Sequence, residues 1–126
     1  MRLKYLLVFN AVVCFVYGIT FVLSPAVVLS LHGITQDPSA KLTGQFYGVE
    51  LIAIGLLTWL ARNAGDSEAR RAIILALLIS TVIGVVIAVL GTVSGVMNAF
   101  GWSGAAIYAV LALGYGYFQF AKSGDS

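Results

Sequence analysis

The sequence has little charge. Asp, Glu, Lys and Arg make up 10% of its 126 residues, whereas 60% of the residues are hydrophobic. Soluble domains usually contain about 25% charged residues, and a soluble fold this short has too little interior to bury so much apolar surface. We therefore expect lipid to cover it. The net charge of +2 comes from scattered Lys and Arg, and without a basic cluster we expect no nucleic-acid partner.

Residues for metal or nucleophilic chemistry are also scarce. The chain has one cysteine, Cys14, and one histidine, His32. A lone cysteine cannot form an intramolecular disulfide, and a metal site needs several His, Cys or carboxylate ligands at suitable spacing. No nucleophile–base pair or phosphate-binding loop is visible. We predict no metal and no cofactor, and we favour a protein that is not an enzyme.

Long apolar runs fill most of the chain, and their length decides the fold class. A membrane-spanning helix needs about 20 residues, so the chain holds four. We predict an all-α, integral membrane four-helix bundle in one domain (1–126), with helices at about 4–23, 38–62, 69–93 and 104–121.

Helix-start signals flank a short segment between the first two predicted spans. Ser24-Pro25 and Asp37-Pro38 each combine a capping residue with a proline suited to the first helical position. The apolar stretch 26–32 ends at Gly33, a residue type that commonly follows a helix. This stretch is too short to span, so we expect it to lie at the membrane surface or between the helices.

The positions of Lys and Arg predict the topology. Positively charged residues favour the cytoplasmic side of a membrane, which predicts both termini in the cytoplasm of a bacterial-type cell inner (plasma) membrane. The connection between the first two spans carries Lys41 alone. The other six are Arg2, Lys4, Arg62, Arg70, Arg71 and Lys122, at the two termini and in the connection between the second and third spans.

Glu50 is the only acid inside the predicted spans. It lies roughly 18 Å from either end of its helix at about 1.5 Å per residue, too deep to reach water easily. A glutamate at that depth must be neutral, paired or facing a wet cavity, and an ionisable residue there is a candidate functional site. The alternative is a protonated, packed acid that hydrogen-bonds a neighbouring helix.

Polar neighbours extend this candidate site. Tyr47 is one helical turn from Glu50 and within reach of a hydrogen bond to it. Asn10 on the first helix is expected to bond Glu50 or a group on the fourth predicted helix such as Tyr108, or to join helices without lining a site. We predict a ligand site formed by Glu50, Tyr47, Asn10, Gln45 and Tyr108, with His32 and Lys41 at the cavity mouth.

Small residues follow the other side of the second predicted helix. Their spacing allows two helices to approach closely, either within the bundle or between two copies of the chain. The face reads Gly44, Gly48, Leu51, Gly55 and Thr58.

The first half of the chain resembles the DoxX-like group of small four-helix bacterial membrane proteins. The residues that carry the resemblance are GITFVLSPAVVLSLHGIT (18–35) and GQFYGVELIAIGLLTWLAR (44–62), with an L-x-x-x-G-L-L pattern from Leu51 to Leu57. The resemblance implies a four-helix bundle and either association with a quinol oxidase or no assigned activity. It transfers no catalytic residue.

Three functional hypotheses remain open from the sequence. The first is a cavity at Glu50 that binds a small amphipathic or lipid-soluble ligand such as a quinone, in a protein that belongs to a larger membrane complex. The second is a proton-coupled small-molecule transporter that acts as a homodimer. The third is a structural membrane partner without a ligand.

Overall fold

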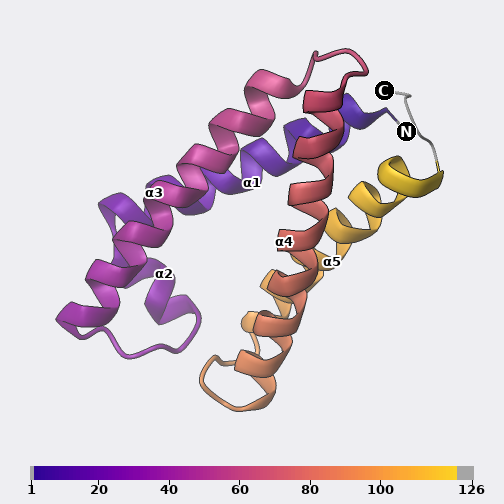
Figure 1. Cartoon of the computed structure of the whole chain (residues 1–126). Helices are drawn as coiled ribbons and strands as arrows, with labels where there is room; N and C mark the ends of the chain where they lie inside the picture. Colours follow the sequence, from indigo (N-terminus) through magenta and orange to yellow (C-terminus); the bar gives the residue numbers. More distant parts are fainter. Residues whose placement is uncertain (1, 122–126) are drawn as a thin grey trace.

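The computed structural model describes residues 2–121, and this part of the chain contains helices and no strands (Figure 1). Three helices are long and apolar enough to cross a membrane, as expected of a membrane protein. They are α1 (Leu3–Leu23), α3 (Pro38–Ala61) and α4 (Glu68–Val93); the others are α2 (Pro25–Leu31), α5 (Gly101–Gly116) and the π-helix η1 (Tyr117–Ala121).

The last predicted helix differs from the observed one. The long helices α1, α3 and α4 begin and end within one residue of the predicted positions, but α5 starts at Gly101 rather than at residue 104 and becomes a π-helix at Tyr117. The early start follows from Asn98, whose side-chain oxygen accepts a hydrogen bond from the Phe100 amide at 3.0 Å and shapes the turn before the helix. Lys122, which we counted for topology, lies outside the described residues.

Of the two predicted helix-start signals, Asp37 caps its helix through its side chain and Ser24 does not, and Ser67 caps α4. The Asp37 carboxylate accepts a hydrogen bond from the Ala40 amide at 2.8 Å, and the Ser67 hydroxyl accepts one from the Arg70 amide at 3.1 Å. Ser24 occupies the capping position before Pro25 but makes no capping bond through its side chain. After α2, Gly33 has φ +71°, a conformation that favours glycine.

The α1 and α3 helices form a hairpin whose backbones touch at glycine. Gly18 of α1 faces Gly48 of α3, and a Cβ added at Gly48 would lie 2.7 Å from the Gly18 carbonyl oxygen. The small-residue face of α3, from Gly44 to Thr58, is buried. This is the packing within the bundle that the small-residue pattern allowed.

The α4 and α5 helices form the second hairpin, again across a glycine. The ring of Tyr108 on α5 lies against Gly84 of α4, with ring carbons 2.6 Å from the position that a Cβ would take there. Near the loop between these helices, the Thr92 side chain packs directly against Gly101. Close packing at glycine therefore organises both hairpins, backbone against backbone in the first and side chain against glycine in the second.

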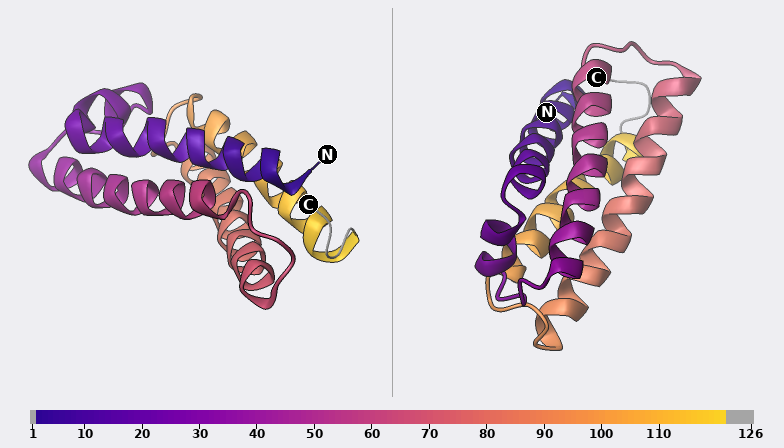
Figure 2. Two further views of the ribbon diagram at one scale, coloured as in Figure 1. Left: turned by 90° about the horizontal axis from the view of Figure 1, so that it is seen from above. Right: turned by 90° about the vertical axis from the view of Figure 1, so that its left-hand side faces the viewer.

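The two hairpins meet at one end of the molecule and diverge toward the other, as α3 and α4 show in Figure 1. Figure 2 shows the same hairpins from above and from the side. All four long helices contribute side chains to the shared contact, which we call the inner cluster. Its buried residues are Leu3, Leu6, Leu7, Ala61, Ile74, Leu77, Leu111, Tyr115 and Phe118.

Arginines gather at this same end of the molecule. The guanidinium of Arg62 stacks on Trp59, 3.8 Å from the ring centroid. The Arg71 guanidinium lies 2.8 Å from the Asp66 carboxylate. Arg70 is buried rather than solvated, and it donates a hydrogen bond to the Ala64 carbonyl at 3.1 Å. These arginines and the loop between α3 and α4 form one basic end.

The glycine contact in the first hairpin predicts a stability difference. We expect Gly48→Ala to destabilise the protein by about 1–3 kcal/mol, because the added methyl group forces α1 and α3 apart. Gly104→Ala is the matched control, since a Cβ there meets no atom within 4 Å and alanine favours the helix. Unfolding in detergent measures both variants, and equal stability of Gly48→Ala and the parent would contradict the packing.

Candidate functional site: a cavity between the hairpins

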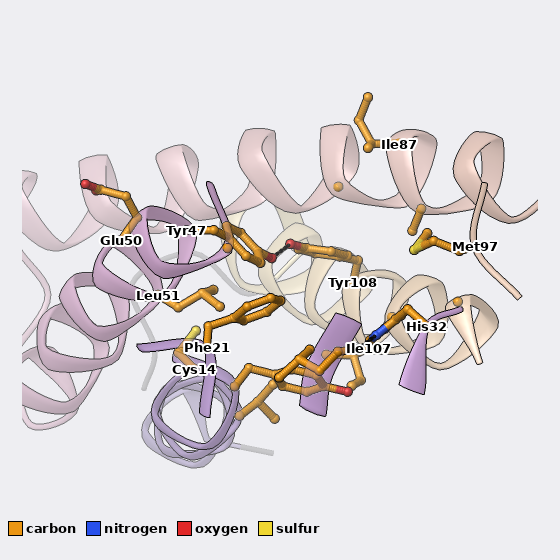
Figure 3. Close-up of a pocket in the computed structure, with 18 of the residues that line it drawn as sticks. Cys14, Phe21, His32, Tyr47, Glu50, Leu51, Ile87, Met97, Ile107 and Tyr108 are labelled. Atoms are coloured by element: carbon orange, nitrogen blue, oxygen red, sulfur yellow. Dashed lines mark hydrogen bonds between the residues drawn. The ribbon is translucent and has the colours of Figure 1, made fainter. Parts of the chain in front are cut away.

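A cavity of about 860 Å³ lies between the two hairpins (Figure 3). Its size is within the range of about 300–1,000 Å³ that is usual for small-molecule sites. Every helix from α1 to α5 contributes to its lining, and the lining is mostly apolar. Among the lining residues are Cys14, Phe21, Leu29, Tyr47, Glu50, Ile54, Thr81, Ile87, Tyr108 and Leu111.

The burial of the lining residues shows which side of the cavity is closed. Asn10 and Cys14 on α1 and Leu111 on α5 are buried and form its floor. In contrast, the lining residues on α3 and α4 include exposed ones, such as Glu50 and Ile87. The cavity therefore opens sideways, between α3 and α4.

The predicted site residues Tyr47 and Tyr108 do come together. Their hydroxyl oxygens are 2.9 Å apart, which links α3 of one hairpin to α5 of the other. Tyr47 also packs edge-on against Phe21, with ring centroids 5.2 Å apart. The predicted hydrogen bond from Tyr47 to Glu50 is wrong, because the tyrosine ring points across the cavity and the carboxylate points away from it (Figure 3).

Asn10 bonds the fourth predicted helix, as expected, but its partner there is Tyr115 rather than Tyr108. Its side-chain amide donates a hydrogen bond to the Tyr115 hydroxyl at 2.6 Å, and its side-chain oxygen accepts one from the Cys14 thiol at 3.1 Å. Asn10 lines the cavity floor, so it both joins α1 to α5 and faces the cavity. Sequence reasoning missed Tyr115. Its spacing of seven residues from Tyr108 places both rings on one face of α5 and was the available signal.

Glu50 lies at the rim of the cavity. Its side chain is exposed, and it makes no hydrogen bond or ion pair with any residue from 2 to 121. The sequence predicted that such an acid would be neutral, paired or next to a wet cavity, and the structure places it beside a cavity. A polar group at the rim is available to whatever enters between α3 and α4.

The α2 end of the cavity is closed by the loop between α4 and α5. The Asn98 amide donates to the His32 carbonyl at 2.8 Å, and the Asn98 side chain donates to the Leu31 carbonyl at 3.1 Å. The His32 ring packs edge-on against Phe100, with centroids 4.9 Å apart. These contacts tie the two hairpins together a second time.

Three residues near this end were predicted as cavity residues, and one of them lines it. His32 lines the cavity, as expected for a residue at its mouth. Gln45 does not, because its amide donates to the Val22 carbonyl at 3.1 Å and joins α3 to α1. Lys41 is exposed and also lies outside the lining.

Hydroxyl groups on α4 that reach the cavity are already used: Thr81 donates to the Leu77 carbonyl at 2.8 Å, and Ser80 donates to the same carbonyl at 3.1 Å. Among residues 2–121 no group of three or more His, Cys, Asp or Glu side chains is placed to hold a metal ion. The remaining polar side chains of this mostly apolar lining include Glu50, Asp37, His32, Asn10 and three tyrosines.

Comparison with known proteins places the chain in a family. Residues 1–118 match a family described as a domain of unknown function (DUF8292). The chain belongs to this family. No curated protein and no solved structure is detectably similar to it. The cavity is the feature of this DUF8292 protein that points to a function.

The bond between the tyrosine hydroxyls predicts an energetic coupling between the hairpins. In a double-mutant cycle of Tyr47→Phe and Tyr108→Phe, we expect a coupling of about 0.5–1.5 kcal/mol in the free energy of unfolding. The control cycle pairs Tyr47→Phe with Tyr117→Phe at the far end of α5, where additivity is expected. Additive effects in both cycles would mean that the tyrosine pair does not link the hairpins.

Proposed function

We propose that this protein is an inner-membrane protein with four spans that binds one small lipid-soluble or amphipathic molecule in the cavity between its hairpins. The observation that carries the proposal is the cavity itself. It has the size of a ligand site, a mostly apolar lining and a few polar groups that converge on it. A quinone is one molecule of this class.

The fourth span in this proposal consists of α5 and η1 together. They run without a break from Gly101 to Ala121, which is about the length that a bilayer requires. An even number of spans agrees with the placement of the N-terminus of α1 and the end of η1 on the side of the basic loop (Figure 1). Because arginines are enriched on that side, the positive-inside rule favours the cytoplasm as its location.

Access from the lipid follows from the direction of the opening. The hairpins are closed at one end by the inner cluster and at the other by Asn98 and α2. The remaining side lies between α3 and α4, and exposed apolar residues such as Ile83 and Ile87 border it. In a bilayer this side faces acyl chains. A lipid-soluble molecule therefore reaches the cavity without crossing a polar surface.

Filling the cavity should remove the bound molecule. Gly104 lines the cavity, and a Cβ added there meets no atom within 4 Å. We expect Gly104→Leu to fold normally and to occupy space that the ligand needs. Gly65→Leu is the matched control in the loop before α4, because a Cβ added there also meets no atom within 4 Å.

Native mass spectrometry of the protein released gently from its own membrane makes the measurement. We expect a small bound molecule on the parent and on Gly65→Leu, reduced at least about tenfold in occupancy on Gly104→Leu. A parent protein with nothing bound would contradict the proposal and favour a structural role. Equal occupancy in all three proteins would place the molecule outside the cavity.

A further inference from the structure

We propose that the ligand is an organic cation, with its positive charge beside Glu50 and its apolar body against the aromatic rings of the cavity. This inference rests on the proposed function and narrows it, because it assigns a sign of charge to the bound molecule. The juxtaposition that carries it is Glu50 at the rim of the apolar space that Phe21, Tyr47 and Tyr108 line, with its flexible side chain at the opening of that space.

The charged residues of the lining are all acidic. Asp37 and Glu50 line the cavity, and none of the described lining residues is Lys or Arg. Lys41, the one basic residue of the α2 end among residues 2–121, is outside the lining. The His32 ring nitrogen Nδ1 lies 2.9 Å from the Val28 carbonyl oxygen, so one of its nitrogens is engaged by the backbone. The fixed charges of the cavity lining therefore favour a ligand with a positive charge.

A cation bound beside Glu50 would offset the cost of placing its carboxylate inside a membrane. A carboxylate near the middle of a membrane is costly unless it is neutral or paired with a positive charge. The ion pairs among residues 2–121 involve Asp66 with Arg70 and Arg71, far along the chain from Glu50. A ligand that brings its own positive charge supplies the partner that α3 and α4 do not provide.

The aromatic rings near Glu50 favour the same class of ligand. Tyr47 is one helical turn from Glu50, and it packs edge-on against Phe21 on one side and meets the Tyr108 hydroxyl on the other. The face of an aromatic ring attracts a cation by about 0.5–2 kcal/mol, more when water is excluded. An organic cation thus finds both a counter-charge and a matching surface in one site.

One feature of the cavity favours anions, and it lies elsewhere. The N-terminal ends of α3 and α5 border the cavity at the α2 end through residues such as Ala40 and Gly101. Helix N-termini carry a partial positive charge. At the N-terminus of α3 this partial positive charge is already balanced by the Asp37 carboxylate, which caps the helix. We therefore expect the positive charge of the ligand on the Glu50 side of the cavity. An anionic probe tests whether the cavity prefers a positive ligand.

Two probes of nearly equal shape and opposite charge decide between the signs. Binding of tetraphenylphosphonium and of tetraphenylborate is measured by equilibrium dialysis on the purified full chain in detergent, with empty micelles as the blank. We expect saturable binding of the phosphonium at one per chain. We expect the borate to bind at least about tenfold more weakly.

Substitution of Glu50 tests its role in this binding. Glu50→Gln keeps the size and hydrogen-bonding capacity of the side chain and removes its charge, so we expect it to weaken phosphonium binding at least about tenfold. Glu50→Asp keeps the charge and should retain most of the binding. Glu68→Gln is the matched control, because Glu68 is an exposed acid in the first turn of α4, outside the cavity.

Each outcome supports or overturns the inference. Phosphonium binding that Glu50→Gln lowers and Glu50→Asp retains supports it. Equal binding of the two probes, unchanged binding by Glu50→Gln, or no phosphonium binding overturns it. If a neutral molecule from the native membrane still occupies the cavity and is lost in Gly104→Leu, the proposed function stands and only the choice of a cation fails.

Discussion

The contact of Gly18 with Gly48 is the constraint on which the remaining structure depends. Because the α1 and α3 backbones touch there, the first hairpin is a tightly packed unit held mainly by van der Waals contact, with one hydrogen bond from Gln45 to the Val22 carbonyl. Tight packing on the glycine face leaves the other side of α3 free. Tyr47 and Glu50 lie outside the glycine face. The same helix therefore closes one hairpin and lines the cavity between the two hairpins.

Two different kinds of contact hold the hairpins to each other. At one end, the inner cluster is apolar and brings together side chains from all four long helices. At the other end, Asn98 binds the backbone after α2 through two hydrogen bonds, and between these ends the Tyr47 and Tyr108 hydroxyls meet across the gap. The cavity is the space that these separated contacts leave unfilled.

Much of the fold was predictable, whereas the hydrogen-bond partners were not. Apolar run length and capping residues such as Asp37 set the ends of α1, α3 and α4, because these signals are local. Of the predicted ligand residues, Asn10, Tyr47, Glu50 and Tyr108 line one cavity and Gln45 does not, and their binding of a ligand stays a prediction. Their pairing depends on how the hairpins rotate against each other, and one helix face offers several partners. For that reason Tyr115 was missed. The resemblance to DoxX-like proteins and the predicted topology stay predictions.

The cavity exists only if the two hairpins are separated from each other. Distances between spin labels test this separation most directly. In a Cys14→Ala background, nitroxide pairs are placed at Thr43 and Ile87 beside the cavity, and at Leu57 and Leu75 near the inner cluster. Double electron–electron resonance in lipid should give a longer distance for the first pair, because α3 and α4 diverge toward α2 (Figure 1). A first distance equal to or shorter than the second would mean that the hairpins pack side by side and that no cavity separates them.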